Sequence, residues 1–350
     1  MKKLKWGVIG VGGIAFRRTI PEGIMKAENA VLKAVQDINE GSAEKAGEIF
    51  GSRVYHREED LLADNEVEAV YIATPAYLHF SQIRKALEAN KHVLVEKPFA
   101  LKIEEGKKIL KLARNKRLKV GVDFMMRFHS HNSKIAEMVK SNTFGRIVMV
   151  RAQLSCWYPK IKNAWRQIPK LGGGGSLIDM GCHCIDLLEY ILNTKVSSVC
   201  CKTAILVQSY QVEDTAVALV EFKNGALGII DACFNIPDES SLNVLEIYGS
   251  KGSVIAKGTI GQSPEGSAAV YLKKTPTGYD AQQTRRAKKM KNELLSVSPY
   301  NTYRAQIESF SYSILENKPV FVSGEDGLWN QKVILACYES SKKGKMVRVK

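Results

Sequence analysis

Several features that would place this chain in a special class are missing from its 350 residues. No stretch approaches the roughly 18 consecutive apolar residues of a membrane span. Residues 1–6 lead straight into a strand pattern, which leaves no room for the hydrophobic region of a signal peptide. The seven cysteines are scattered and odd in number, unlike those of a small disulfide-bonded scaffold. We therefore expect a cytoplasmic protein with reduced thiols and no contact with membranes.

The chain also has little that points to nucleic acid, although its formal net charge is +15. Basic residues gather at 107–119 and 285–291, but no aromatic residues are interleaved with them. No helix-turn-helix, zinc-finger or RNP pattern accompanies them. We interpret both stretches as solvated basic faces, with a modest contribution to attracting an anionic cofactor.

Metal-ligand spacing is lacking as well. Cys182, His183 and Cys184 are adjacent, but neighbouring residues on a helix project about 100° apart and cannot converge on one ion. The chain has no CxxC or HxxxH pair that would complete such a set. We therefore expect no metal site.

Over residues 4–122 the chain alternates short apolar strand patterns with helical patterns. The strands are expected at residues 4–9, 31–36, 53–55, 69–73, 93–95 and 119–122. Uninterrupted apolar strands that alternate with helices are typical of a parallel sheet covered by helices on both faces. This part of the chain is therefore predicted to be an α/β domain.

Beyond residue 124 the pattern changes to longer strands joined by turns, such as Asn224-Gly225. These strands are expected at residues 146–156, 196–208, 212–222, 226–234, 243–249 and 252–257. Runs of strands joined by turns predict a mostly antiparallel sheet. Helices are expected at residues 131–140, 177–192, 302–317 and 325–343, and a long loop at 261–300 that could hold one strand at 269–272.

The length and the change of pattern together predict two domains, because 350 residues are too many for one ordinary core. We place the first at residues 1–123 and the second, of α+β type, at residues 124–350.

The turn after the first strand consists mainly of small residues. Gly10 lets the chain turn tightly, Gly12 lets the backbone approach a pyrophosphate, and Ala15 lets the next helix pack closely on the sheet. Gly13 adds slack, and the helix that begins near Ile14 presents free N–H groups to the phosphates. Because this turn joins a predicted strand to a predicted helix, it predicts a dinucleotide site.

Asp37 ends the second predicted strand, 22 residues past Ala15. A carboxylate at that point can accept hydrogen bonds from the adenosine ribose hydroxyls, and it repels a 2′-phosphate. This favours NAD over NADP, although Arg17 and Arg18 leave NADP open as the alternative. A solvated aspartate in a turn is the other interpretation of Asp37.

Lys97 follows the predicted strand at residues 93–95, between Glu96 and Pro98. Ligands bind at the carboxyl ends of strands in open α/β sheets, and an ammonium group there can stabilise a developing alkoxide. Pro98 restricts Lys97 to extended conformations and so limits where its side chain points. Taken alone, a lysine at a strand end is more often a surface charge.

The apolar helix predicted after the glycine run 172–175 carries Asp179 and His183, which are four residues apart and share one face. Asp186 lies near the same stripe. A carboxylate beside an imidazole orients it and raises its basicity, which suits a general base. Such pairs also decorate ordinary helix surfaces, but this helix is otherwise apolar, so its polar stripe should face a cleft.

Taken together, these motifs resemble those of the Gfo/Idh/MocA oxidoreductase family, which includes glucose-fructose oxidoreductase and inositol dehydrogenase. The resemblance runs nearly end to end, in order: the glycine turn, Ile72–Pro75 with His79, Glu96–Pro98, Trp165-Arg166, Gly173–Asp179 with His183 and Asp186, and Ser323–Gly327. It implies a Rossmann domain followed by an α/β domain whose open antiparallel sheet often builds oligomers. We expect a homo-oligomer, a dimer or a tetramer, on this basis.

The resemblance also implies roles for individual residues. Lys97 would lie beside the nicotinamide and the substrate. His183 would accept the hydroxyl proton, and Asp179 would orient the substrate and this base. Cofactor contacts are implied for Thr74, Pro75, His79 and Glu96, and substrate contacts for Arg127, Trp165 and Arg166. The stretch around Arg127 departs from the family's usual Asn and Arg pattern, with Asp123 and two methionines, which puts the substrate contacts in doubt.

The resemblance thus implies an NAD(P)-dependent oxidoreductase that transfers a hydride between nicotinamide and a secondary alcohol or carbonyl of a sugar, cyclitol or similar polyol. A non-catalytic NAD(P)-binding sensor or scaffold is the alternative function. The joint presence of Lys97, Asp179 and His183 argues against it, because a sensor needs only the glycine turn and Asp37.

Overall fold

The computed structural model of the chain describes residues 2–272 and 292–350. The basic stretch 285–291, expected to be a solvated face, lies outside the described residues. In the other basic stretch, Lys107, Lys108, Lys111 and Arg114 are exposed on one helix, as expected.

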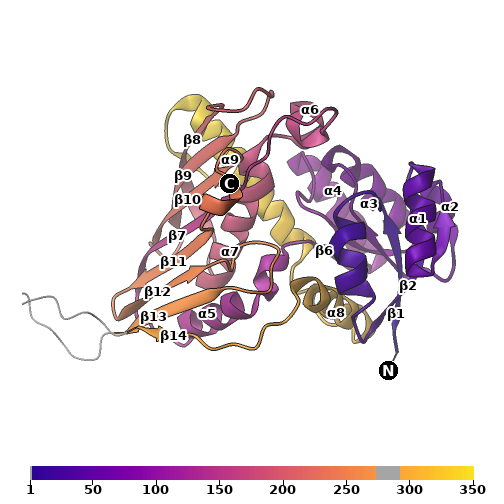
Figure 1. Cartoon of the computed structure of the whole chain (residues 1–350), viewed down its shortest axis with the longest axis horizontal. Coiled ribbons are helices and arrows are strands. Elements are labelled where there is room, and N and C mark those ends of the chain that lie inside the picture. Colours follow the sequence, from indigo (N-terminus) through magenta and orange to yellow (C-terminus); the bar gives the residue numbers. More distant parts are fainter. Residues whose placement is uncertain (1, 273–291) are drawn as a thin grey trace, which may run out of the picture.

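The amino-terminal third of the chain forms a Rossmann-type layer of strands and helices (Figure 1). Within the described residues its sheet has six parallel strands in the order β3-β2-β1-β4-β5-β6, which confirms the predicted fold class. The strands are β1 (Leu4–Ile9), β2 (Ala30–Gln36), β3 (Arg53–Tyr55), β4 (Ala69–Ile72), β5 (His92–Val95) and β6 (Val120–Val122). The helices between them are η1 (Ala15–Ile24), α1 (Glu40–Phe50), α2 (Glu58–Ala63), α3 (His79–Glu88) and α4 (Ile103–Lys116), with a short turn η2 (Ala76–Leu78).

The strand order reverses next to β1, since β2 pairs with one side of β1 and β4 with the other. A crevice opens at such a switch point outside the carboxyl ends of the strands. The glycine turn, Thr74 and Glu96 all directly follow strands that end at this edge.

The second sheet has nine strands among the described residues, in the order β14-β13-β12-β11-β7-β10-β9-β8-β15. They are β7 (Ile147–Ser155), β8 (Val196–Ala204), β9 (Thr215–Phe222), β10 (Leu227–Cys233), β11 (Val244–Gly249), β12 (Gly252–Lys257), β13 (Ser267–Leu272), β14 (Glu293–Leu294) and β15 (Val347–Arg348). All neighbours are antiparallel except β7 and β10, so the prediction of a mostly antiparallel sheet is confirmed.

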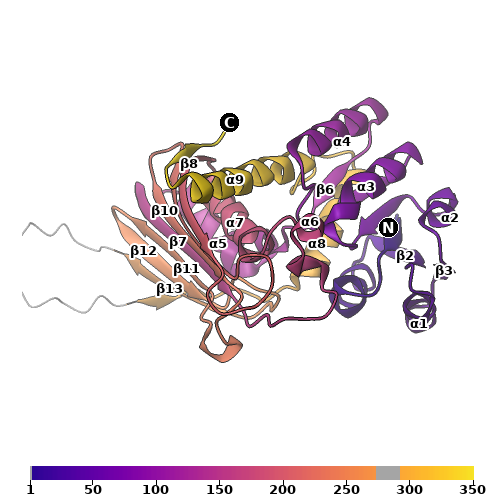
Figure 2. The ribbon, with the colours of Figure 1, turned by 90° about the horizontal axis from the view of Figure 1, so that it is seen from above.

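Three helices cover one face of this sheet, and Figure 2 shows them on the side toward the Rossmann layer. They are α5 (Ser130–Lys140), α7 (Cys182–Leu192) and α9 (Gly324–Lys343). Shorter helical elements connect the layers: η3 (Met125–Phe128), η4 (Trp165–Gln167), α6 (Pro169–Gly172), η5 (Leu177–Gly181) and η6 (Asp238–Ser240). None of the helices in the described part of the chain is long and apolar enough to cross a membrane.

Two local expectations are refined by the structure. Residues 177–192 are helical as expected, but the first turn, η5, is π-helical and only α7 is a regular α-helix. In the stretch expected to be a long loop, β13 confirms the strand expected at 269–272, and the short strand β14 was not expected.

Helix α8 (Thr302–Leu315) belongs to the predicted second domain by sequence but packs against the first sheet (Figure 1). Its Ile307 and Phe310 share an apolar core with Trp6 of β1. The Trp6 Nε1–H donates a hydrogen bond to Ser311 Oγ at 3.1 Å. The boundary at residue 123 therefore stays a prediction, and by packing α8 completes the nucleotide-binding layer.

Removing the Phe310 ring should loosen this docking. Phe310 is 3% exposed, so Phe310→Ala should lower the free energy of unfolding by about 3–5 kcal/mol because a buried cavity is left. Tyr312, on the same helix and 53% exposed, is the control: Tyr312→Ala should change it by about 0.5 kcal/mol or less. Equal effects in urea denaturation would contradict the docking of α8.

Candidate active site

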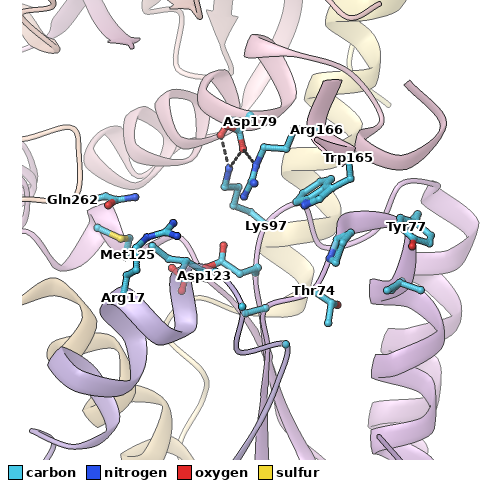
Figure 3. A pocket seen from close by; sticks show the side chains of 18 of the residues that line it. Arg17, Thr74, Tyr77, Lys97, Asp123, Met125, Trp165, Arg166, Asp179 and Gln262 are labelled. Carbon is cyan, nitrogen blue, oxygen red and sulfur yellow. Dashed lines mark hydrogen bonds and ion pairs between the residues drawn. The ribbon is translucent and has the colours of Figure 1, made fainter. Parts of the chain in front are cut away.

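A cavity of about 1460 Å³ runs along the carboxyl ends of the first sheet and is roofed by the second domain. One end is lined by Gly10, Gly12, Gly13 and Asp37, and the other by Lys97, Asp179 and His183. Most of the predicted cofactor residues and all three predicted catalytic residues thus line one continuous space, part of which is shown in Figure 3.

The glycine turn is shaped by close contacts on one side and open space on the other. Gly10 has φ +88°, and a Cβ there would lie 2.7 Å from Thr74 Cγ2. A Cβ on Gly13 would meet no described atom within 4 Å. The first turn of η1 has no side-chain cap. The N–H of Arg17 donates to the Gly13 carbonyl at 3.3 Å, which leaves the N–H groups before it to bind phosphate oxygens.

Asp37 lines the cavity just after β2 and also holds the turn. Its Oδ2 accepts hydrogen bonds from the N–H groups of Val11 at 2.9 Å and Gly12 at 3.0 Å. A carboxylate can accept further hydrogen bonds, so Asp37 remains able to bind a ribose hydroxyl. The open turn, the uncapped helix and this carboxylate fit a dinucleotide.

Lys97 and Asp179 join the two domains at the other end of the cavity. The Lys97 ammonium donates to the Asp179 carbonyl at 2.6 Å and forms an ion pair with its carboxylate. Arg166 Nε lies 3.4 Å from the same carboxylate, and Figure 3 shows Lys97 and Arg166 converging on it. Burial alone would disfavour the charged form of both groups. The attraction between the two charges outweighs the effect of burial, so the pKa of Lys97 is raised and that of Asp179 is well below its usual range.

Glu213 fixes the segment that carries Asp179. Its Oε1 accepts hydrogen bonds from the N–H of Gly175 at 2.9 Å, the N–H of Leu177 at 3.1 Å and the Tyr338 hydroxyl at 2.7 Å. A Cβ on Gly175 would lie 1.9 Å from the Glu213 carbonyl oxygen, so the close approach requires glycine. The glycine run thus lets the π-turn η5 dock where Asp179 meets Lys97.

His183 lies in the first turn of α7 and lines the cavity. Its ring packs edge-on against Phe124 with centroids 5.9 Å apart, and its buried Nδ1 has no partner among the described residues. Burial and the charge of Lys97 lower the pKa of His183 to about 3, so the imidazole is neutral near neutral pH. The expected pairing with Asp179 is not seen: within the described residues no hydrogen bond joins them, because Asp179 is engaged by Lys97 and Arg166.

The other expected site residues divide into two groups. Thr74, Pro75, Glu96, Trp165 and Arg166 line the cavity. The Arg166 guanidinium stacks 4.3 Å from the centroid of the Trp165 ring, which holds both side chains in the roof.

His79 and Arg127 lie elsewhere than expected. The ring nitrogens of buried His79 face the carbonyl oxygens of Pro98 at 2.7 Å and Thr74 at 3.0 Å, so it braces the cavity wall from behind. Arg127 is 6% exposed and is not a lining residue. It pairs with Asp186 at 2.8 Å and with Asp326 at 3.4 Å, which leaves its guanidinium committed to the protein.

The structure also brings to the cavity residues that the sequence did not suggest for it. They are Tyr77, Asp123, Tyr158 and Tyr303, among others. Asp123 could have been predicted at the cavity, because it directly follows a predicted strand. No sequence pattern could have placed Tyr303 there, because only the packing of α8 brings it to this edge of the sheet. Within the described residues, no group of three or more His, Cys, Asp or Glu side chains is placed to hold a metal.

A Rossmann sheet with a phosphate-binding turn, joined by its Lys97 to a second domain that carries a neutral histidine, defines a dinucleotide-dependent oxidoreductase. Family comparison agrees. Residues 4–124 match the family model described as "Oxidoreductase family, NAD-binding Rossmann fold", and residues 136–349 match "Oxidoreductase family, C-terminal alpha/beta domain". The chain belongs to the Gfo/Idh/MocA family, which confirms the resemblance seen in its motifs.

Named relatives span the whole chain. A 1,5-anhydro-D-fructose reductase of Ensifer adhaerens is 25% identical, with 99% of this chain and 98% of the relative covered. A myo-inositol 2-dehydrogenase of Thermotoga maritima is also 25% identical, with 93% of this chain and 92% of the relative covered. The fold matches the crystal structure of an aldose-aldose oxidoreductase from Caulobacter crescentus with TM-score 0.87 and 22% identity, covering 99% of this chain and 100% of that one.

Two glycine substitutions distinguish the effect of the turn on stability from its effect on NADH binding. Gly13→Ala should leave the free energy of unfolding within about 0.5 kcal/mol of the native value, because the added methyl meets no described atom. It should still weaken NADH binding about tenfold or more, since it fills the space left for phosphate. Gly10→Ala should cost about 1–3 kcal/mol of stability through its positive φ and the contact with Thr74.

The two effects can be measured by urea denaturation and by NADH fluorescence. Unimpaired NADH binding by a stable Gly13→Ala protein would show that the phosphates do not lie against this turn.

Proposed function

We propose that the protein transfers a hydride between NAD(P) and a secondary alcohol or carbonyl of a sugar, cyclitol or similar polyol. The observation that carries this proposal is the meeting of Lys97, Asp179 and His183 at one end of a cavity whose other end is the glycine turn. The relatives support the substrate class, because their names refer to an anhydro-sugar and an inositol.

The bound dinucleotide would supply or accept the hydride at its nicotinamide, and the protein would manage the proton. Lys97 has three N–H donors and uses two of them on Asp179, so the third is left for a substrate oxygen. An ammonium there would stabilise negative charge on that oxygen as the hydroxyl loses its proton. Asp179 fixes the direction of this donor.

His183 would accept the hydroxyl proton. Its pKa of about 3 keeps it in the neutral, accepting form across the working pH range, but also makes it a weak base. Lys97 would also lower the pKa of a hydroxyl bound beside it, which offsets its lowering of the pKa of His183 and keeps the gap between these two pKa values from widening. Anion-stabilising and proton-accepting groups therefore act as one unit.

Asp37 favours NAD as the cofactor. Its carboxylate lies at the end of β2, where it would accept hydrogen bonds from the adenosine ribose and repel a 2′-phosphate. Arg17 also lines the cavity, so NADP remains the alternative cofactor.

We further infer a homo-oligomer, a dimer or tetramer, in the cytoplasm. The face of the second sheet opposite its helices exposes Val217, Leu219 and Leu227, and an apolar sheet face of this kind favours association. All seven cysteines lie in the described residues as free thiols, as expected of a reducing compartment.

The role of His183 can be tested by removing its proton acceptor. His183→Ala should lower kcat for oxidation of the true polyol substrate by about 10²–10⁴-fold, because general-base catalysis is lost. NADH affinity, measured by fluorescence, should change less than about threefold, because the turn and Asp37 are untouched.

As a control, His56→Ala alters a half-exposed histidine at the adenosine end of the cavity and should leave kcat within about twofold. An unchanged kcat in His183→Ala would refute the assignment of the base.

A further inference from the structure

Two carboxyl groups meet on one buried tyrosine below the Lys97 end of the cavity. The Tyr71 hydroxyl lies 2.6 Å from Glu96 Oε1 and 3.0 Å from Asp123 Oδ2. Tyr71 comes from β4, and the two acids follow β5 and β6, its neighbours in the sheet. Both acids line the cavity, and Figure 3 shows Asp123 in the floor beneath Lys97.

The hydrogen atoms available do not suffice for two carboxylates. Tyr71 has a single hydroxyl hydrogen, and its oxygen already accepts one from Thr19 Oγ1 at 3.1 Å. If both acids were ionised, one carboxylate oxygen would face the tyrosine oxygen with no hydrogen between them. One proton must therefore sit on the pair, with one acid donating to Tyr71 and the other accepting from it.

The surroundings decide which acid holds that proton. Burial and the charge of Glu96 hold the pKa of Asp123 well above its usual range. Burial raises the pKa of Glu96 too, but the neighbouring Lys97 is the main influence that opposes this, whereas for Asp123 Lys97 ranks behind the hydrogen bonds. Asp123 is thus the neutral acid, Glu96 carries the charge, and the pair has a net charge of about −1.

A third polar group at this corner has no partner. The Tyr303 hydroxyl is buried, lines the cavity and makes no hydrogen bond within the described residues, and Tyr303 is 2% exposed. Burial and the charges of Asp123 and Glu96 raise its pKa, so it remains a neutral donor close to the pair. Tyr303 therefore adds a neutral hydroxyl, with Arg18 close by, to the corner that holds the pair.

We propose that Asp123 and Glu96, bridged by Tyr71, share one proton at the nicotinamide end of the site and set the preference between oxidised and reduced cofactor. This inference rests on the proposed function, which brings the nicotinamide to Lys97. The oxidised ring is cationic and the reduced ring is neutral, so the single charge of the pair favours the oxidised form. Loss of the shared proton to solvent adds a second negative charge and strengthens that preference.

Other charged or titratable groups face the pair: Lys97, Arg166, Asp179, His183, Tyr71 and Tyr303, with Arg17 and Arg18 on η1. The pKa values of Lys97, Arg166, Tyr71 and Tyr303 are raised, while those of Asp179 and His183 are lowered. These shifts keep all six from titrating near neutral pH. Linkage then gives the sign: because NAD⁺ prefers the doubly ionised pair, its affinity relative to NADH rises with pH.

The first experiment uses the full chain without cofactor and tests whether Asp123 and Glu96 share a proton. Infrared spectra at neutral pH should contain the carbonyl stretch of a protonated carboxyl group, and Asp123→Asn should remove it. Absence of such a band, or its survival in Asp123→Asn, would overturn the shared proton whatever the enzyme's activity.

The second experiment measures Kd for NAD⁺ and NADH against pH over the range in which the protein stays folded. In the native protein the ratio Kd(NADH)/Kd(NAD⁺) should rise about fivefold or more with pH, as expected for one added unit charge near the ring. Asp123→Asn should make the ratio independent of pH. Glu104→Gln, a carboxyl-to-amide change on the exposed surface of α4, is the matched control and should behave as the native protein.

Glu96→Gln provides a second variant in case Asp123→Asn does not fold. It removes the other half of the pair, and the change in the ratio should then move to lower pH. A native ratio that does not vary with pH, or a variation that survives in Asp123→Asn, would overturn the proposal. Failure of both nucleotides to bind at any pH would instead refute the proposed function, while the infrared band would still decide the shared proton.

Discussion

The contact between Lys97 and Asp179 is the constraint on which the rest of the site depends. Lys97 follows a strand of the Rossmann sheet and Asp179 lies in the π-turn of the second domain, so this one ion pair closes the cavity between the domains. A buried pair of this kind is stable only when its hydrogen bonds are satisfied. Here the carbonyl of Asp179 and the guanidinium of Arg166 complete it. The glycine run and Glu213 can be understood as the means of bringing the turn close enough.

The pair also sets the charges of the groups around it. Burial and the charge of Lys97 together keep His183 neutral, and Lys97 opposes the rise in the pKa of Glu96, so that in our proposal Asp123 is the acid that retains the proton. The charge of Lys97 thereby influences the protonation of His183 on one side and of the proposed Asp123–Glu96 pair on the other. Removal of that cation would alter every titration in the cavity together, because these groups interact across a region of low dielectric.

Much of the fold followed from local pattern. The alternation of apolar strands with helices predicted the parallel sheet, and turns such as Asn224-Gly225 predicted the antiparallel one. Lys97 and His183 could be singled out because one follows a strand at the ligand-binding edge of the sheet, the other lies on an otherwise apolar helix, and both belong to the ordered motifs that carry the family resemblance. The partner of Asp179 could not be predicted, because we applied the spacing of a regular α-helix to a segment that begins with a π-turn. Arg127 was expected at the substrate, whereas its acidic partners come from α7 and α9, contacts that no local pattern encodes. Tyr303 was missed for the same reason, since it reaches the cavity only through the docking of α8.

The central claim is that Lys97 and Asp179 act as one catalytic unit assembled across the two domains, and a double-mutant cycle on kcat tests it most directly. Lys97→Met and Asp179→Asn should each lower kcat by about 10²-fold or more, and the double variant should be little worse than the poorer single variant. NADH binding by each variant would show that the nucleotide layer is intact. Losses that multiply in the double variant would mean that the two residues act independently, and would contradict the account.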